Sequence, residues 1–166
     1  MAAFEYLDKR LFDKYESTLF NILADNMTVI APTGADREED HKSWYSAVKD
    51  GLCADARRIV LIKEIGTERI IGFFQYYTNS HVFMMEEIQI IPEFQSRDNI
   101  FRDLYGFVLG NLSDSPELVE AYADKRNSKS LAILHRLGLS VIGENQDGSC
   151  YRLRGRYSEI LKWYYE

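Results

Sequence analysis

The sequence has few of the residues that mark fibrous, secreted or membrane-spanning chains. Its 166 residues include only 2 cysteines, 3 prolines and 10 glycines, which argues against a disulfide-rich, disordered or collagen-like chain. No apolar run approaches the ~18 residues of a membrane-spanning helix. The opening stretch MAAFEYLDKR also lacks the apolar run of a secretion signal. These absences predict a cytoplasmic location and no membrane partner.

Positive charge is also scarce. Lys and Arg number 20 against 26 Asp and Glu, so the formal net charge is -6. An acidic molecule repels the phosphate backbone, and nucleic acid is therefore not an expected partner. Cys53 and Cys150 belong to no CxxC or Cys/His cluster, and the histidines share no metal-ligand spacing. We therefore expect no metal.

The remaining composition suits one packed domain. Hydrophobic residues make up 46% and charged residues 28% of the chain, which are ordinary proportions for a protein with a core. A chain of this length is about the size of one domain and too short for two full ones. We therefore expect a single domain over residues 1–166.

The first third of the sequence has helical periodicity. Apolar residues over 7–23 recur at three- and four-residue spacings. We expect this helix to break near Asn26, before a short extended piece over 28–31. An acidic run over 36–40 then opens a second helix that ends around Gly51.

The rest of the chain alternates between strand and helix patterns. Three β-branched and aromatic runs, IVLIKEI, RIIGFFQYYT and HVFMMEEIQII, are separated by short turns and predict an antiparallel meander. A helix with one apolar face follows over 101–112, and Asp98 is a candidate N-cap. A strand over 118–123 leads to a helix that ends at Gly138, which we expect to be a left-handed cap.

The C-terminal segments SVIGE and SCYRLRG predict a hairpin, and SEILKWYYE predicts a short helix. The element order is then ααβββαβαββ with a short C-terminal helix. This order predicts an α/β (α+β) domain with a mixed sheet. The aromatic side chains of Trp163, Tyr164 and Tyr165 either pack on that sheet or join the partner of a homodimer.

Two segments together carry a resemblance to a known family. EEIQIIPEFQSRDNIFRDLYGFVL, followed after a strand by NSKSLAILHRLGLSVIGE, resembles the core of the GNAT superfamily of acyl-CoA-dependent N-acetyltransferases. The order of elements matches from Phe4 to about Leu153. The resemblance implies a mixed, mostly antiparallel central sheet flanked by helices, with acetyl-CoA as cosubstrate.

The family's loop Gln/Arg-x-x-Gly-x-Gly/Ala opens a helix, and its backbone N–H groups bind the pyrophosphate of coenzyme A. The matching residues here are Gln95, Ser96, Arg97, Asp98, Asn99 and Ile100. Asp98 and Ile100 stand at the two glycine positions. An Asp carboxylate about 4 Å from a phosphate would cost ~1 kcal/mol if screened by water and ~4 kcal/mol at an effective dielectric of 20. Ser96, Arg97 and Arg102 would compensate in part, or Asp98 caps the helix with no phosphate nearby.

The resemblance assigns further cofactor contacts to main-chain and amide groups. In the family, the pantetheine arm pairs with the main chain just before the proline of the loop, here Gln89, Ile90 and Ile91. Asn127 resembles the Asn that lies along the cofactor arm. Its alternative role is to cap the helix that it begins.

Acetylation of an amine needs a base to take the proton of the amine. The family often uses a Glu on the strand before the loop, and Glu87 matches, with Glu86 beside it. Consecutive strand residues face opposite ways. The resemblance implies a bulge and favours Glu87, and the alternative is a carboxylate that faces solvent. Leu134 stands where many members have a Tyr as acid, so Tyr122, Tyr151 or solvent would have to act.

The resemblance implies direct transfer of an acetyl group from acetyl-CoA to a primary amine in a ternary complex. The acceptor would be a small-molecule amine or a peptide. The acidic stretch 36–40 either attracts a cationic amine or only complements the helix dipole. The missing glycines and the missing Tyr motivate an alternative, a GNAT-like fold that serves as a catalytically inactive binding or regulatory module.

Overall fold

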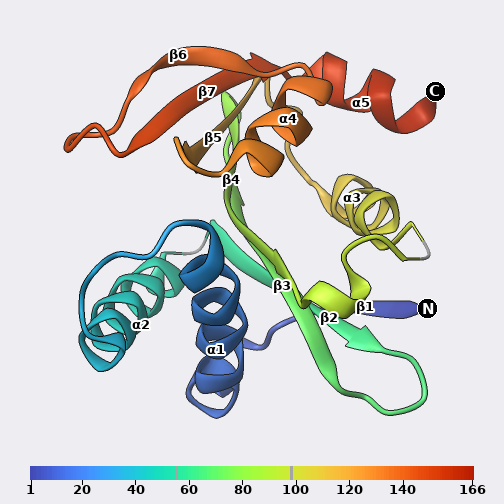
Figure 1. Ribbon diagram of the computed structural model, residues 1–166. Helices are drawn as coiled ribbons and strands as arrows, with labels where there is room; N and C mark the ends of the chain where they lie inside the picture. The colour runs from blue at the N-terminus through green and yellow to red at the C-terminus, as the bar shows by residue number, and fades with distance from the viewer. Residues whose placement is uncertain (55, 98) are drawn as a thin grey trace. The chain divides into compact units, whose positions relative to one another are not determined.

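The computed structural model describes residues 1–54, 56–97 and 99–166. Its strands are hydrogen-bonded in the order β1-β2-β3-β4-β5-β7-β6 (Figure 1). The strands are β1 (Ala2–Tyr6), β2 (Arg57–Glu64), β3 (Ile70–Thr78), β4 (Val82–Ile90), β5 (Leu118–Asp124), β6 (Ser140–Glu144) and β7 (Cys150–Arg156). The helices are α1 (Phe12–Ile30), α2 (Arg37–Cys53), α3 (Ile100–Asn111), α4 (Ser128–Arg136) and α5 (Tyr157–Tyr165), with short 3-10 turns η1 (Lys9–Leu11) and η2 (Pro92–Phe94).

The sheet is mixed and mostly antiparallel. β1 pairs antiparallel with β2, and β7 pairs antiparallel with both β5 and β6. The strands β2, β3 and β4 are consecutive neighbours joined by short turns, which only antiparallel pairing allows, because a parallel connection needs about a dozen residues or more. β4 and β5 form a parallel pair, with Val82–Met85 opposite Leu118–Ala121. This arrangement confirms the fold class predicted from the sequence.

The chain forms two compact units. The first consists of residues 1–75 and 87–104, and the second of residues 76–86 and 105–166. β3, β4 and α3 each contribute residues to both units.

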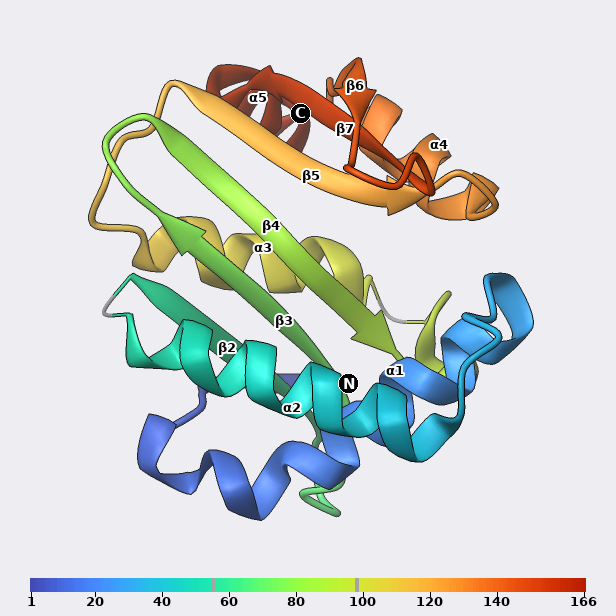
Figure 2. The same cartoon turned by 90° about the vertical axis from the view of Figure 1, so that its left-hand side faces the viewer.

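In the first unit, α1 and α2 lie on one face of β2 and β3 (Figures 1 and 2). Their facing side chains form a core with Leu7: Phe12, Leu19, Val48, Leu52, Ile59, Leu61 and Phe73. The ring of Trp44 lies 6.0 Å from that of Phe12 and 5.6 Å from that of Phe20. This aromatic contact joins the two helices, because Trp44 belongs to α2 and both phenylalanines belong to α1.

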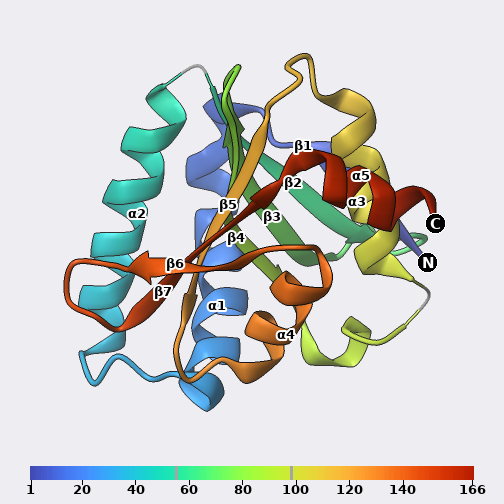
Figure 3. The ribbon, with the colours of Figure 1, turned by 90° about the horizontal axis from the view of Figure 1, so that it is seen from above.

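In the second unit, α5 follows directly from β7 (Figure 3) and packs on α3. The rings of Trp163 and Tyr105 meet edge to face at 5.5 Å. Tyr105 is fully buried, and this burial raises the pKa of its phenol. The Tyr164 hydroxyl lies so close to Gly106 that a Cβ there would be 2.3 Å away. Trp163 and Tyr164 therefore pack on α3 of their own unit, while Tyr165 is exposed.

The structure corrects two expectations at the start of the chain. The strand β1 was not predicted, because its five residues are defined by pairing with β2, about 58 residues away. The expected break near Asn26 and the extended piece over 28–31 are wrong, since α1 continues to Ile30. The Asn26 side chain makes its hydrogen bonds to Gln89 and Ile90 of β4. It therefore does not compete with the helix for the backbone groups next to it. The Thr28 hydroxyl donates a hydrogen bond to the Ala24 carbonyl one turn earlier, which a helix accommodates.

Other local predictions are confirmed. α2 occupies the expected segment, the C-terminal hairpin and helix are present, and Gly138 has a φ of 93° at the end of α4. Asp98, the expected N-cap of α3, lies outside the described residues. In the ranges that the structure describes, no helix is both long and apolar enough to cross a membrane.

Candidate functional site

A chain of hydrogen-bonded side chains runs along the C-terminal half of β4. The Gln89 Nε2 donates to Glu87 Oε1 at 2.6 Å, and the Asn26 Nδ2 donates to Gln89 Oε1 at 2.9 Å. Glu87 and Gln89 are two residues apart and so share one face of the strand. Asn26 comes from α1 and is only 7% exposed. These hydrogen bonds therefore connect α1 to Glu87, the carboxylate that the family resemblance indicates as the candidate base.

The backbone carbonyl of Ile90 is the second acceptor in this cluster. It accepts from Asn26 Nδ2 and from Gln95 Nε2, both at 2.9 Å. The next residue, Ile91, donates its N–H to the Ile71 carbonyl on β3. Because neighbouring strand residues direct their backbone groups to opposite edges, the two amides meet Ile90 on the edge of β4 that faces away from β3.

The predicted cofactor residues of β4 are thus partly engaged within the chain. The Gln95 side chain connects the start of the candidate loop to β4, through its hydrogen bond to the Ile90 carbonyl. The Gln89 side chain is hydrogen-bonded to both Asn26 and Glu87. The carbonyl of Ile91 accepts from the Phe94 N–H. The structure therefore brings together Glu87, Gln89, Ile90 and Gln95. The neighbouring Glu86 is partly buried.

The loop before α3 is exposed, whereas the first residue of the helix is not. Ser96, Arg97 and Asn99 are exposed, and Ile100 is 2% exposed. The Arg97 guanidinium lies over the Phe94 ring at 5.3 Å. Asn99 has a φ of 56°, a left-handed conformation that Asn tolerates better than most residues. The Ile100 side chain is thus packed inside the protein at a position where the family loop has a small residue.

The α4 residues have local roles. Asn127 is the N-cap, and its side-chain oxygen accepts from the Ser130 N–H at 3.0 Å. Leu134, at the position of the family's Tyr, is 7% exposed and has no proton to donate. His135 is exposed, and its Nδ1 lies 3.0 Å from the Leu139 carbonyl.

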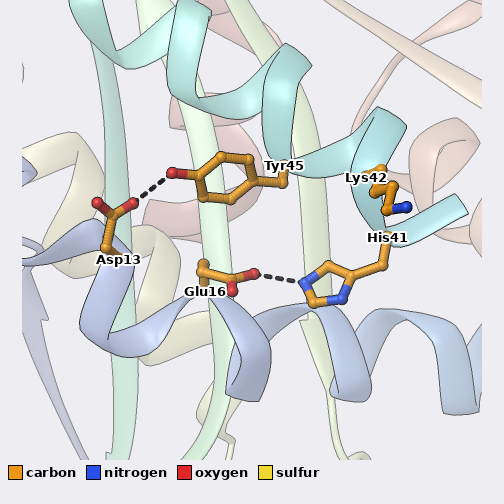
Figure 4. A pocket seen from close by; sticks show the side chains of 5 residues that line it. All are labelled: Asp13, Glu16, His41, Lys42 and Tyr45. Atoms are coloured by element: carbon orange, nitrogen blue, oxygen red, sulfur yellow. Dashed lines mark hydrogen bonds and ion pairs between the residues drawn. The ribbon is translucent and has the colours of Figure 1, made fainter. Parts of the chain in front are cut away.

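A pocket of about 270 Å³ lies between α1 and α2, lined by Asp13, Glu16, His41, Lys42 and Tyr45 (Figure 4). The His41 Nε2 is 2.5 Å from Glu16 Oε2, and the Tyr45 hydroxyl donates to Asp13 at 2.6 Å. His41 also stacks on Phe20, with ring centroids 4.4 Å apart.

The acidic groups of this pocket already have cationic or hydroxyl partners. The Lys49 ammonium bonds both oxygens of Asp13, at 2.8 and 2.9 Å. The hydrogen bond from Lys49, helped by that from Tyr45, holds the pKa of Asp13 below its usual value. The pocket therefore offers no uncompensated charge at Asp13 to a ligand.

Comparison with known proteins rests on structure. No family model and no curated protein matches the sequence. The structure is similar to that of the PaiA N-acetyltransferase from Thermoplasma acidophilum in complex with coenzyme A. The two are 10% identical, and the match covers 95% of this chain and 99% of that chain with a TM-score of 0.67.

Two further solved structures are similar to this chain. FdhC, described as a nucleotide-linked sugar GNAT, is 13% identical, with 97% of this chain and 89% of that chain covered and a TM-score of 0.66. The chain has the GNAT acetyltransferase fold. The spermidine N-acetyltransferase from Vibrio cholerae, solved with CoA and spermine, shares this fold at 16% identity. That match covers 96% of this chain and 98% of that chain with a TM-score of 0.57.

Within this GNAT fold, sequence reasoning missed two features. Asn26 was interpreted as a helix breaker, and its partners Gln89 and Ile90 are 63 and 64 residues away. The pair of Glu16 and His41 was also missed. Its two residues lie on different helices, 25 residues apart, so no spacing within one helix indicates the pair. In the described parts of the chain, no group of three or more His, Cys, Asp or Glu side chains is placed to hold a metal ion.

Proposed function

We propose that this chain is an acyl-CoA-dependent N-acetyltransferase that transfers an acetyl group from acetyl-CoA to a primary amine in a ternary complex. The observation that supports this best is the GNAT fold, which matches over 95% of the chain a protein that was solved with coenzyme A. A fold alone hosts many functions. The second support is therefore local, the oriented carboxylate of Glu87 on β4.

Glu87 suits the role of the base. The nitrogen of a neutral amine attacks the thioester carbonyl, a C–N bond forms, and the C–S bond breaks. The amine loses a proton to the base, and the departing thiolate takes one up. Glu87 is partly buried, and Gln89 fixes one of its oxygens. Glu86 remains the alternative base, and it faces the other way if the strand is regular.

The start of α3 suits the phosphates of the cosubstrate. Arg97 is exposed and Arg102 is partly buried in the first turn, and arginine pairs well with phosphate. Helix N-termini attract anions. The exposed residues Ser96 and Asn99 would complete this set, and the buried side chain of Ile100 keeps its bulk away from the surface of the loop.

The pantetheine arm would lie along the end of β4, and Asn127 is a separate candidate contact. The carbonyl of Ile90 already accepts two side-chain amides. An amide of the arm would therefore pair with other main-chain groups among Gln89, Ile90 and Ile91, or displace one of these bonds. This engaged carbonyl favours the second candidate function, a GNAT-like module that does not catalyse transfer.

Binding of coenzyme A separates the two candidates. A ligand present at 100 times its dissociation constant stabilises the fold by about 2.7 kcal/mol. For a domain of this size that is a rise in Tm of several degrees. We expect such a rise with acetyl-CoA. An unchanged Tm at millimolar acetyl-CoA would instead support the module.

Transfer is measured as release of the CoA thiol with a panel of amines. The panel includes polyamines, an amino sugar nucleotide and a peptide with a free N-terminus, since both a small-molecule amine and a peptide are candidate acceptors. Glu87→Gln is expected to lower kcat by about 100-fold or more, the usual contribution of a general base. If Glu86→Gln has this effect and Glu87→Gln does not, the base is Glu86.

Asp98 lies outside the described residues, and its role is open to a direct test. If the loop holds the pyrophosphate, a carboxylate at this position opposes the phosphates. Asp98→Gly should then strengthen binding of coenzyme A. Weaker binding in this variant would show that the phosphates bind elsewhere.

The acidic stretch 36–40 gives little support for a cationic acceptor. Asp40 accepts a hydrogen bond from Thr33 at 2.6 Å, and Glu38 lies 3.9 Å from Lys42 one turn later. These contacts, together with the helix dipole, account for the acidic first turn of α2. The panel of amines therefore needs neutral as well as cationic members.

A further inference from the structure

We propose that Asn26 is a positioning residue for the Glu87 carboxylate, which it orients through the amide of Gln89. This inference rests on the proposed transferase function, in which Glu87 acts as base. It assigns a role to a residue of α1 that does not itself touch the carboxylate.

The direction of the hydrogen-bonded chain is set at one end by the backbone. A carbonyl oxygen can only accept, so the contact of Asn26 with the Ile90 carbonyl must be made by its NH₂ group. The same NH₂ group has a second hydrogen, which it donates to Gln89 at 2.9 Å. The amide of Asn26 is therefore fixed in one of its two orientations.

The fixed Asn26 in turn fixes Gln89. The Asn26 NH₂ group can donate only to the oxygen of the Gln89 amide, so the NH₂ group of Gln89 faces Glu87, with its nitrogen 2.6 Å from Oε1. In the flipped orientation, the oxygen of Gln89 would meet the carboxylate oxygen and repel it. Asn26 thus holds the Gln89 amide in the orientation that presents a donor to Glu87.

The donor matters for base catalysis. A hydrogen bond to a carboxylate favours its charged form and holds its orientation. A base must be charged before it can take the proton from the amine. Loss of Asn26 should therefore lower the rate of transfer and also narrow the pH range in which Glu87 is charged.

The experiment compares Asn26→Leu and Gln89→Met with the wild-type chain. Asn26→Leu removes the anchor of the Gln89 amide, and Gln89→Met removes the donor to Glu87 itself. Gln89→Met also keeps the bond from Asn26 to Ile90 and serves as the second variant if Asn26→Leu does not fold. We expect kcat to fall about 10- to 100-fold in both. KM for acetyl-CoA should stay near its wild-type value in Gln89→Met, which keeps the bond from Asn26 to Ile90. The acid limb of the pH–rate profile should move to higher pH. In a Glu87→Gln background, neither change should lower the rate further.

Thr28→Val is the matched control. It removes a hydrogen bond of α1, from the Thr28 hydroxyl to the Ala24 carbonyl, near the same end of the helix, and it should leave kcat and the pH profile unchanged. If Asn26→Leu and Gln89→Met leave the acid limb unchanged while the wild type transfers acetyl groups, the positioning role is refuted and the transferase function stands.

A readout without activity separates the two proposals. The titration of the Glu87 carboxylate is followed by carbon-13 NMR in the wild type and in both variants. A midpoint at higher pH in both variants supports the positioning role even if no amine is acetylated. An unchanged midpoint overturns it, whatever the activity of the wild type.

Discussion

The carbonyl oxygen of Gln89 on β4 lies directly against Gly72 on β3. A Cβ built on Gly72 would be 2.4 Å from this oxygen and 3.2 Å from the Cα of Ile90. The contact involves backbone atoms, so no flexible side chain can move aside. The glycine thus allows β3 to approach the part of β4 that carries the candidate site.

Gly72→Ala is expected to destabilise the chain by about 1–3 kcal/mol, the usual cost of adding a methyl group to a tightly packed region. The displaced Gln89 should also lower the rate of any acyl transfer. Urea unfolding measures the first effect. Gly110→Ala in α3 is the control, because a Cβ there meets nothing within 4 Å. Its stability should be unchanged or slightly higher, and an equal loss in both variants would contradict the close-contact argument.

Glu120 of β5 is a buried carboxylate held by two arginines of β7. It is 5% exposed, and it accepts from Arg154 Nε at 2.7 Å and from Arg152 Nη2 at 3.0 Å. Glu120→Gln removes the charge while keeping the shape. Both arginines are more than a third exposed and can turn to water, so we expect a loss of about 1–3 kcal/mol in the free energy of unfolding.

The matched variant for this measurement is Glu144→Gln. Glu144 pairs with Lys125 at 2.6 Å on the surface, where an ion pair contributes about 0–1 kcal/mol. If Glu144→Gln costs as much as Glu120→Gln, burial of Glu120 is not the reason for its effect.

The same carboxylate predicts how stability depends on pH. Burial alone would raise the pKa of Glu120, but the hydrogen bonds from Arg154 and Arg152 outweigh it and hold the pKa below the ordinary 4.5. The folded value lies below the unfolded value, so this contribution is present above about pH 4.5 and is lost as the pH falls through the folded value. The stability difference between wild type and Glu120→Gln should shrink from pH 6 toward pH 3. A constant difference would refute the depressed pKa.

Asn127 can be tested for two roles at once. Asn127→Ala removes the cap of α4 and should cost about 1 kcal/mol, whereas Asn127→Ser keeps a capping oxygen and should cost less. If Asn127 also contacts the cofactor arm, both variants bind coenzyme A more weakly than the wild type. Calorimetric titration measures this affinity. Wild-type affinity in Asn127→Ser would leave Asn127 with a capping role only.

Local patterns in the sequence were sufficient for most of the fold. The spacing of apolar residues in α3, the meander of β2 to β4 and the cap at Gly138 depend on neighbours within one turn or one hairpin. β1 could not be found in this way, because five residues at the start of a chain become a strand only when β2 is available to pair with them.

The candidate site shows the same limit. Glu87 and Gln95 came from a resemblance to a family, not from spacing, and no sequence pattern indicates that Gln95 bonds to Ile90. Asn26 is a residue type with low helix propensity. Only its distant partners on β4 explain why α1 does not end there. Such polar contacts between distant segments have no periodicity that a sequence pattern could show.

The placement of the two tryptophans gives each compact unit an intrinsic fluorophore. The Trp44 ring contacts those of Phe12 and Phe20 on α1, and the Trp163 ring contacts that of Tyr105. Single-tryptophan proteins, made by Trp44→Phe or Trp163→Phe, would therefore report on the unfolding of one compact unit at a time. Coincident melting curves would reveal cooperative unfolding of the two halves, and separate curves would give each half its own stability.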